Sequence, residues 1–520
     1  MSQSKYVLAI DNGTQSIRAL VFDEIGNVIA KSKVDLEAYF STQPGWAEQE
    51  AEYYWQSLAQ ACQNIWAQGV VKPEQIAGVS LTTQRYTMIN LDQDKKPLRP
   101  AIVWMDQRRA NVEKPLPGIW GFLVKALGLT NLISELRSKA RDNWVAQNQP
   151  EIWAKTKYYL NLSGYLTYQL TNQLKDSTGS TMGYLPYDYR NQRWAKKSDL
   201  KWKLLEATRE MMPDLVFPGE ELGRISQQAS EITGIPAGVK MIAAASDKAC
   251  EVLGSGGIAP HIGCLSYGTT ATINTATTKY VETIPFIPPY TAAMPKVYNT
   301  EMMVYRGFWM VSWFKNEFAQ MEQRKAKELG VEAEQLFDEL LNQVPAGSMG
   351  LMMQPYWSPG VRQPGPEGKG AFIGFGDVHK RAHVYRSILE GIAYELRSGK
   401  EQIEKRSGTK ITCLRVSGGG SQSDAAMQLT ADIFGMPVER PHTYEASGLG
   451  AAINCFVGLG IHSSYNVAID KMTRVGEVFQ PDQPTVELYD RLYKEVYQKM
   501  YKRMKPLYKS IREITGYPKK

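Results

Sequence analysis

A mixed α/β fold made of two similar halves is predicted by three features of this 520-residue sequence. The chain opens with two apolar stretches, residues 6–10 and 17–22, which flank the turn-like run Asp11-Asn12-Gly13-Thr14. A helical pattern over residues 50–68 and a β-branched run over 76–81 follow, as expected where helices alternate with buried strands. The third feature is that the opening hairpin recurs halfway along the chain.

The recurrence begins near residue 262. Residues 262–266 and 271–274 are predicted strands, and Tyr267-Gly268-Thr269-Thr270 is the turn between them. The Gly-Thr pair occupies the same place in this hairpin as Gly13-Thr14 does in the first, which indicates an internal duplication. The predicted linker between the two halves is the glycine-rich run Gly254-Ser255-Gly256-Gly257.

A glycine cluster, Gly418-Gly419-Gly420, follows a predicted strand over residues 414–417. A helix is expected from about Asp424 to Phe434, where Gly435 ends it. A glycine-rich turn that enters a helix N-terminus favours anions, because free N–H groups and the helix dipole face the ligand. An ordinary strand-to-helix turn is the equally weighted alternative.

Composition is typical of a soluble globular protein, with 43% hydrophobic and 22% charged residues. The net charge of +7 is concentrated at the C-terminus, because residues 491–520 carry ten Lys and Arg against two Glu. The main body is therefore not a nucleic-acid-binding surface. Tyrosines and aliphatic residues recur at helical spacing over residues 489–500, which predicts that this basic tail is an amphipathic terminal helix.

The cysteines and the apolar segments predict a cytoplasmic protein without a membrane span. The five cysteines form no Cys-x-x-Cys pair and are odd in number, which argues against a disulfide framework and a structural zinc site. No signal peptide is expected. The most hydrophobic stretch, residues 119–136, is interrupted by Gly and Lys and is predicted to be a buried or amphipathic helix.

Seven motifs, in their order along the chain, resemble those of the FGGY carbohydrate kinases of the actin-like ATPase superfamily. They are the segments Asp11–Arg18, Gly45–Gln49, Ala101–Arg108, Pro150–Leu160, Ala245–Cys250, Gly268-Thr269 and Gly418–Gly420. Gly370–Glu390 resembles a further signature of the family, apart from Phe375, where a smaller aliphatic residue is usual. The resemblance implies an α/β fold of two actin-like (ribonuclease H-like) domains, with ATP and sugar bound in the cleft between them.

The domain boundaries expected from this resemblance follow the duplication. An N-terminal kinase domain over residues 1–253 would carry the sugar and phosphate side, and a C-terminal kinase domain over 254–470 would carry the nucleotide side. The basic helical tail would occupy residues 471–520.

The phosphoryl donor implied by the resemblance is ATP with Mg²⁺. The chain contains no Walker motif GxxxxGK[ST], so a P-loop kinase is excluded, and hairpin turns are expected to hold the phosphates. The implied nucleotide-binding residues are Asp11, Gly13, Thr14, Gly268, Thr269, Gly418, Gly419 and Gly420. Asp11 is expected to hold Mg²⁺ through water. Asp247 is the implied catalytic base, and its structural alternative is to cap the helix that follows.

The sugar side implied by the resemblance combines aromatic faces with hydroxyl-binding groups. The candidate residues are Trp46, Gln84, Arg85, Trp104, Asp106 and the base Asp247. Trp46 and Trp104 have an alternative role as core aromatics. Gln84-Arg85 resembles the glycerol-kinase pattern Asn-Gln-Arg-Glu, but Tyr86 replaces the glutamate. Lys248 is unusual, and three roles stay open for it: tuning Asp247, meeting an acidic or carbonyl-bearing substrate, or pointing to solvent.

The expected activity is ATP-dependent phosphorylation of a hydroxyl of a small sugar or polyol, with a ketose such as xylulose as the first choice. The alternatives are a glycerol kinase and a non-catalytic sugar or nucleotide sensor on the same fold. A sensor would be expected to have lost Asp247 or Asp11, and both are present. No nucleic-acid or membrane partner is expected, and a homodimer is one assembly that the sequence allows. The roles of segment 115–143 and of the basic tail stay open.

Overall fold

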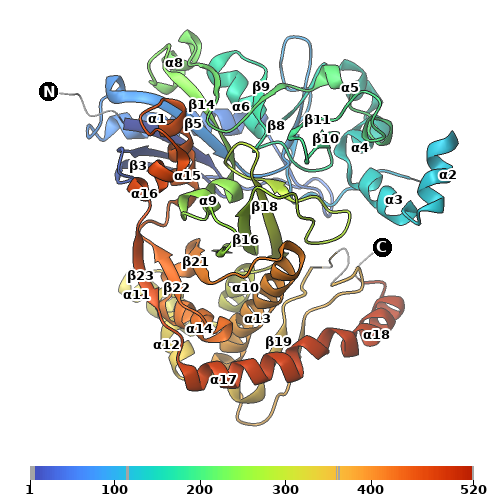
Figure 1. Ribbon diagram of the computed structural model, residues 1–520, viewed down its shortest axis with the longest axis vertical. Coiled ribbons are helices and arrows are strands. Elements are labelled where there is room, and N and C mark those ends of the chain that lie inside the picture. Colours follow the sequence, from blue (N-terminus) through green and yellow to red (C-terminus); the bar gives the residue numbers. More distant parts are fainter. Residues whose placement is uncertain (1–5, 113–115, 117, 359, 361–363, 518–520) are drawn as a thin grey trace.

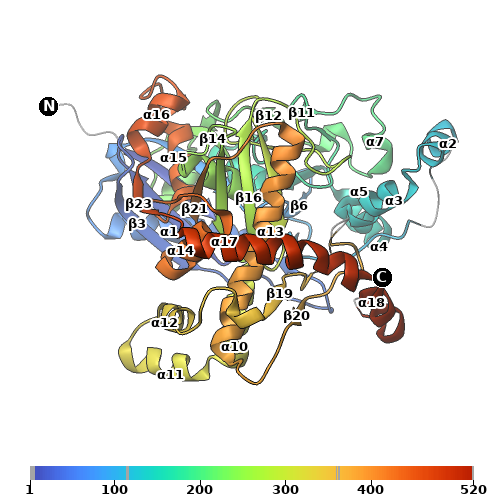
Figure 2. The same cartoon turned by 60° about the horizontal axis from the view of Figure 1, so that its bottom comes forward.

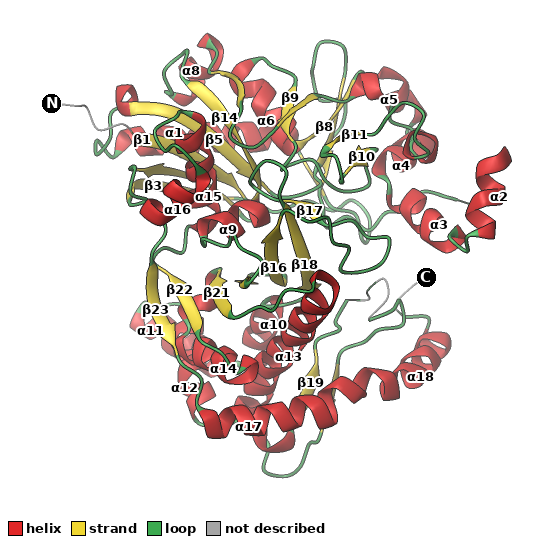
Figure 3. Ribbon diagram, in the orientation of Figure 1, coloured by secondary structure: helices red, strands yellow, loops and turns green. Residues whose placement is uncertain are grey.

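The protein folds into two lobes, each built around one central β-sheet (Figure 1). The structure is a computed structural model, which describes residues 6–112, 116, 118–358, 360 and 364–517. Helices pack against the sheets of both lobes (Figure 3). The mixed α/β class predicted from the sequence is confirmed.

The first half contains a six-stranded sheet in the order β13-β14-β5-β1-β2-β3. Its strands are β1 (Tyr6–Asn12), β2 (Ser16–Phe22), β3 (Val28–Asp35), β5 (Ile76–Thr83), β13 (Glu221–Arg224) and β14 (Lys240–Ser246). β1, β5 and β14 run parallel, and β2, β3 and β13 are antiparallel to their neighbours. The helices α1 (Ala51–Ala67), α6 (Leu162–Thr171) and α8 (Gln227–Thr233) bury their apolar side chains against one face of this sheet.

The second half repeats this topology in a seven-stranded sheet, in the order β17-β18-β16-β15-β21-β22-β23. Its strands are β15 (Ile262–Tyr267), β16 (Ala271–Thr277), β17 (Tyr290–Thr291), β18 (Tyr298–Val304), β21 (Cys413–Ser417), β22 (Val438–Pro441) and β23 (Val475–Phe479). From β18 to β23, neighbouring strands have the same parallel and antiparallel relations as from β3 to β13. The internal duplication predicted from the two Gly-Thr hairpins is thereby confirmed.

One helix of the second half covers the sheet of the first. α15 (Ala446–Gly458) packs with α9 (Asp247–Gly254) on the face formed by β1, β5 and β14 (Figure 1). The two helix backbones touch, because a Cβ on Gly254 would lie 2.0 Å from the Ala446 carbonyl oxygen and one on Gly450 1.9 Å from the Cys250 carbonyl oxygen. The run Gly254–Gly257, predicted as a linker, is thus packed inside the molecule, and its glycines permit close helix contact.

A smaller four-stranded sheet extends the first lobe, in the order β4-β7-β6-β8. Its strands are β4 (Glu48–Gln49), β6 (Met88–Leu91), β7 (Ala101–Ile102) and β8 (Tyr158–Asn161), and α4 (Arg141–Asn148) and α5 (Pro150–Lys155) lie beside it. The single helix predicted over residues 119–136 is wrong in one respect. Two helices, α2 (Gly118–Ala126) and α3 (Thr130–Lys139), are separated at Gly128, whose φ of +67° is a conformation that glycine adopts readily. They project from the lobe (Figure 1), and Phe122 and Leu127 are exposed.

The long helix α13 (Arg381–Ser407) crosses the second lobe, and the C-terminal segment lies across it (Figure 2). That segment consists of α17 (Gln483–Arg491), a π-helical turn over Leu492–Tyr497, and α18 (Gln498–Thr515). Tyr489, Tyr493 and Tyr497 are buried against α13, where they surround Tyr394. The amphipathic helix predicted over residues 489–500 is found, but Val475–Phe479, which the prediction counted with the helical tail, form strand β23 of the second sheet.

The remaining helices and strands complete the two lobes. They are α7 (Lys201–Leu204), α10 (Trp309–Phe318), α11 (Gln320–Leu329), α12 (Phe337–Asn342), α14 (Asp424–Phe434), α16 (Tyr465–Met472), β9 (Lys175–Ser177), β10 (Tyr187–Asp188), β11 (Arg193–Trp194), β12 (Asp214–Val216), β19 (Met352–Gln354) and β20 (Ala371–Ile373). Among the described residues, no helix combines the length and the apolar character needed to cross a membrane.

Candidate active site

Asp11 lies buried at the end of β1, and a cation from the neighbouring strand faces it. Arg18 on β2 places its Nη1 atom 3.6 Å from the Asp11 carboxylate and 3.1 Å from Glu445, the residue before α15. Burial raises the pKa of Asp11 to about 7; Arg18 opposes this rise, and Asp247 and Glu445 add to it by repulsion. The predicted metal-binding carboxylate and the predicted base are therefore close enough to interact electrostatically.

The hydroxyl group of Thr14 connects the Gly13-Thr14 turn to the predicted sugar side. Thr14 Oγ1 donates to Gln84 Oε1 over 3.1 Å and accepts from Trp104 Nε1 over 2.9 Å. Gln84 is buried and donates in turn to the Tyr54 hydroxyl over 3.1 Å. Three residues that the sequence assigned to two different ligands thus form one hydrogen-bonded chain, in which the Thr14 hydroxyl proton is already used.

The side chain of Arg85, a residue of the first half, contacts residues of the second half. Its guanidinium makes a bidentate pair with Glu301 on β18, with N–O distances of 2.9 and 3.0 Å, and lies 4.5 Å from the centre of the Tyr290 ring. The Arg85 Nε atom is buried without a hydrogen-bond partner among the described residues. A planar guanidinium held in this way has a fixed orientation beside the site.

Asp247 is the first residue of α9 and directly follows β14, where the preceding backbone is buried. Its Oδ1 atom accepts from the Lys248 backbone N–H over 2.7 Å. Burial raises the pKa of Asp247, and the positive charges of Arg85 and Lys248 oppose that rise. A carboxylate at a helix N-terminus, partly desolvated and flanked by two cations, is suited to accept a proton from a bound hydroxyl.

The turn at Gly268-Thr269 and the turn at Gly418–Gly420 lie against one another. A Cβ on Gly418, where φ is +87°, would lie 2.9 Å from the Tyr267 backbone, one residue before Gly268. A Cβ on Gly420 would lie 2.2 Å from the Phe308 ring, whereas one on Gly419 would meet nothing within 4 Å. Gly418 and Gly420 are therefore required by packing, and Gly419 leaves open space in front of the backbone. Thr269 is exposed at the tip of its turn.

The side chains of Trp46 and Asp106 contact other protein residues in one cluster around Arg108. The Asp106 carboxylate accepts from the Ala47 N–H and from three N–H groups of Arg108, and its side chain is 1% exposed. The Arg108 guanidinium lies 4.1 Å from the centre of the Trp46 ring, and Trp144 packs edge-on against Trp46. This geometry favours a positioning role for both residues over direct contact with a substrate.

Several site residues were missed by the sequence analysis. Glu251, Glu301 and Glu445 each pair with a cation of the site, and Ser266 and Ser417 hydrogen-bond to Glu251. Glu251 could have been found, because it lies one helical turn after Asp247 and three residues after Lys248, in a helix whose other residues are uncharged. Glu301 lies on a strand of the other half and has no local signal.

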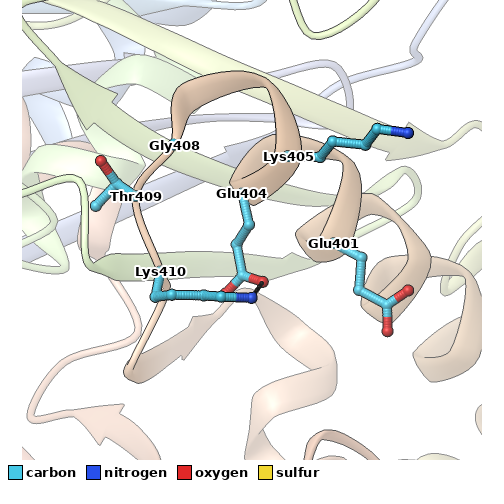
Figure 4. Close-up of a pocket in the computed structure, with 6 residues that line it drawn as sticks. All are labelled: Glu401, Glu404, Lys405, Gly408, Thr409 and Lys410. Carbon is cyan, nitrogen blue, oxygen red and sulfur yellow. Dashed lines mark hydrogen bonds and ion pairs between the residues drawn. The ribbon is translucent and has the colours of Figure 1, made fainter.

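A surface pocket at the end of α13 is separate from this site (Figure 4). Its lining residues are Glu401, Glu404, Lys405, Gly408, Thr409 and Lys410. Glu404 already pairs with Lys400 at 2.8 Å and with Lys410 at 3.2 Å. The pocket lies before the start of β21, whereas the Gly418 turn follows its end, and none of the predicted site residues lines it.

Comparisons with known proteins agree with the duplicated fold. The FGGY family of carbohydrate kinases matches with its N-terminal domain over residues 6–254 and with its C-terminal domain over 263–459. The chain is 29% identical to an Escherichia coli protein named uncharacterized sugar kinase YgcE, covering 94% of this chain and 92% of that one. It is 27% identical to a xylulose kinase of Lactococcus lactis, with 98% of both covered.

A solved structure supports the same fold. Gluconate kinase from Lactobacillus acidophilus superposes with a TM-score of 0.79 at 20% identity, covering 99% of both chains. Other relatives carry the names glycerol kinase and gluconokinase, so the names divide among several substrates. Matches to both domains of one family span most of the sequence, and this chain belongs to the FGGY family of carbohydrate kinases.

Proposed function

We propose that this protein transfers the γ-phosphoryl group of ATP to a hydroxyl of a neutral ketose or polyol, with Asp247 as the general base. The observation that carries the proposal is the position of Asp247: it starts α9 next to Arg85 and Lys248, within electrostatic reach of Asp11. Phosphoryl transfer requires a proton acceptor, a site for the metal and phosphate-binding turns near one another, and these residues can supply them.

The proposed reaction assigns one task to each group. The substrate hydroxyl gives its proton to Asp247 as its oxygen forms a bond to the γ-phosphorus, and the bond from that phosphorus to the β-phosphate oxygen breaks. Arg85, held by Glu301, orients the substrate through the Nη N–H groups that the ion pair does not use. The products are a sugar phosphate and ADP, and the proton leaves from Asp247 to solvent.

Asp11 fits the role of a magnesium-binding residue. Its pKa is raised by burial and by neighbouring carboxylates, so a divalent cation would relieve an existing excess of negative charge. Among the described residues no group of three or more His, Cys, Asp or Glu side chains could hold a metal. Asp11 would therefore share the ion with phosphate oxygens and water, as Mg²⁺ commonly requires. When bound, the ion would neutralise charge on the phosphates.

The glycine turns fit a nucleotide phosphate chain. Nothing lies within 4 Å of a Cβ built on Gly419, and nothing closer than 3.6 Å to one built on Gly268. Both turns therefore leave room for a ligand next to the backbone, where amide N–H groups bind anions well.

The substrate class is proposed from charge pairing. The two cations nearest Asp247 already have carboxylate partners, since Arg85 pairs with Glu301 and Lys248 with Glu251. A sugar acid would need a cation that faces it, whereas Arg85 is held in a bidentate pair and Lys248 Nζ lies beside the Gly268 turn, so neutral substrates are favoured. Tyr86, which replaces the glutamate of the glycerol-kinase pattern, packs its ring on Gly183 and under Arg141. It offers no carboxylate for a small polyol, which leaves a longer ketose such as xylulose as the first choice.

The test is a coupled assay of ADP release with wild-type enzyme against a panel of substrates at matched concentrations. The panel contains xylulose, ribulose, fructose, xylitol, glycerol and gluconate. We expect the highest kcat/KM for a ketose and values at least about tenfold lower for glycerol and gluconate. A gluconate preference would contradict the charge argument. Binding of sugars without any transfer would support the sensor alternative.

A further inference from the structure

The side chain of Lys248 points toward the turn at Gly268-Thr269. It is 22% exposed, and its Nζ atom donates to Glu251 Oε2 over 2.9 Å and to the Ser266 hydroxyl. A Cβ built on Gly268 would have Lys248 Nζ as its nearest neighbour, at 3.6 Å. The ammonium group therefore lies beside the backbone of the Gly268-Thr269 turn and not in bulk solvent.

Glu251 fixes this ammonium relative to three elements. Its buried carboxylate accepts from Ser266 Oγ over 2.9 Å and from Ser417 Oγ over 2.8 Å. Ser266 is the penultimate residue of β15, two positions before Gly268, and Ser417 directly precedes Gly418. The Glu251 carboxylate thus connects α9 to β15, which leads into the Gly268 turn, and to β21, which leads into the Gly418 turn.

The arrangement leaves donor capacity on the ammonium. A lysine ammonium has three N–H donors, of which Glu251 and Ser266 take two. Glu251 cancels the charge of Lys248 at long range, yet a desolvated ammonium still makes a strong hydrogen bond to a phosphate oxygen at short range. The Lys248–Glu251 pair is therefore neutral in the resting protein and still able to bind an anion that reaches the turn.

We propose that Lys248 binds the γ-phosphate of ATP, and that Glu251 is the positioning residue that holds the ammonium in place. This inference rests on the proposed function, because it takes ATP as the donor. Lys248 stays protonated throughout, donating to a γ-phosphoryl oxygen while the proton of the sugar hydroxyl passes to Asp247. Because the γ-phosphoryl group is absent from ADP, Lys248 discriminates between ATP and ADP and is not a sugar-binding residue.

The experiment compares the affinities of two nucleotides by isothermal titration calorimetry, with Mg²⁺ and without sugar. The probes are ADP and the non-hydrolysable analogue AMP-PNP. We expect Lys248→Met to weaken AMP-PNP binding by about 10–100-fold, the value of a hydrogen bond to a charged group, and to change ADP binding less than about threefold. Lys248→Arg should restore part of the AMP-PNP affinity. Equal losses for both nucleotides, or no loss for either, would overturn the proposal.

Matched variants separate binding from folding. Lys400→Met is the control. Lys400 lies on α13, its Nζ atom is 2.8 Å from a carboxylate oxygen of Glu404 on the same helix, and its side chain is 14% exposed. This variant should leave both affinities unchanged. If Lys248→Met does not fold, the variant Lys248→Met with Glu251→Gln avoids a buried unpaired carboxylate and should show the same selective loss for AMP-PNP. A selective loss of sugar affinity, with AMP-PNP binding intact, would assign Lys248 to the substrate and refute the proposal.

The outcome is distinguishable from a failure of the proposed function. If wild type transfers phosphate to no member of the substrate panel but Lys248→Met still loses AMP-PNP selectively, the proposed substrate is wrong and the Lys248 assignment stands. If wild type phosphorylates a sugar and Lys248→Met binds both nucleotides normally, only the Lys248 assignment is wrong.

Discussion

The guanidinium of Arg85 and the carboxylate of Glu301 form a bidentate ion pair that joins the two halves of the chain within electrostatic reach of Asp247. The Glu301 side chain is 1% exposed and that of Arg85 17% exposed, so water screens the pair weakly. A buried pair of this kind is costly to break on one side only, because the remaining charge loses its partner. Tyr290 covers the guanidinium and adds a cation–π contact.

The first prediction concerns this pair. Glu301→Gln and Arg85→Met should each lower the free energy of unfolding by about 3–5 kcal/mol, and the double variant Arg85→Met with Glu301→Met by less than the sum of the two single variants. Denaturant titration measures this. The exposed pair Arg209–Asp214 is the control, and breaking it with Asp214→Asn should cost less than about 1 kcal/mol. Additive effects at Arg85 and Glu301 would show that the pair is not coupled.

The second prediction concerns the base. Asp247→Asn should lower kcat at least about 100-fold, because the amide cannot accept the hydroxyl proton, while the affinity for Mg²⁺ and ADP stays near wild type. Steady-state kinetics and calorimetry measure the two quantities. Asp482→Asn, at the exposed N-cap of α17, is a matched substitution away from the site and should leave kcat unchanged. A kcat within about tenfold of wild type for Asp247→Asn would remove it from the role of base.

The third prediction concerns the pH dependence of metal binding at Asp11. Since its pKa is raised to about 7, Asp11 is largely protonated below that pH, and a divalent cation must displace the proton. The affinity for Mn²⁺ in the presence of ADP should therefore fall by roughly tenfold for each pH unit below 7 and level off above it. Asp11→Asn should bind Mn²⁺ more weakly, with only the pH dependence of the nucleotide itself. Identical pH profiles for the two proteins would contradict the assignment.

The fourth prediction concerns the C-terminal segment. Glu395 on α13 accepts from the hydroxyls of Tyr497 and Tyr356 over 2.8 and 2.9 Å, and burial raises its pKa. With a raised pKa the folded protein favours the protonated acid, so the ionised form at neutral pH depends on these donors. Tyr497→Phe should lower the free energy of unfolding by about 1–3 kcal/mol at pH 7.5 and by less at pH 5, where Glu395 takes up a proton more readily.

A neutral acceptor provides the control for this experiment. Tyr508 on α18 donates to Gln354 Oε1 over 2.7 Å, and Gln354 does not titrate. Tyr508→Phe should therefore destabilise the protein by the same amount at both pH values. A pH-independent effect of Tyr497→Phe would show that the charge of Glu395 has no part in holding the tail.

The sequence predicted the features that are written into local patterns. The hairpin turns Gly13-Thr14 and Gly268-Thr269 have matching turn chemistry, so the duplication could be predicted and is found in the strand order. The helix after Gly418–Gly420 was placed at Asp424–Phe434 because Gly435 provides a clear stop, and α14 has these bounds. Periodicity along one element is sufficient for such predictions.

What could not be predicted depends on contacts between distant segments. Glu301 is separated from Arg85 by more than two hundred residues, and nothing around it in the sequence marks it as an ion-pair partner. The sequence also could not show that the oxygens of Asp106 are taken up by Arg108, since an Arg two residues away along a turn has many alternative partners. Ser266 on β15 and Ser417 on β21 reach Lys248 and Glu251 on α9 only once these distant segments have packed together.

The position of α15 also constrains how the chain can fold during its synthesis. The sheet face that includes Val7 and Phe22 is covered by α15, which the ribosome makes roughly 190 residues after α9 is complete. At a synthesis rate of about 5–20 residues per second, α15 is made on the order of 10–40 s after α9, and until then this face is not covered by α15. The first lobe is therefore expected to stay incompletely folded on the ribosome and to expose an apolar sheet face to chaperones, and to become protease-resistant only when the second lobe has emerged.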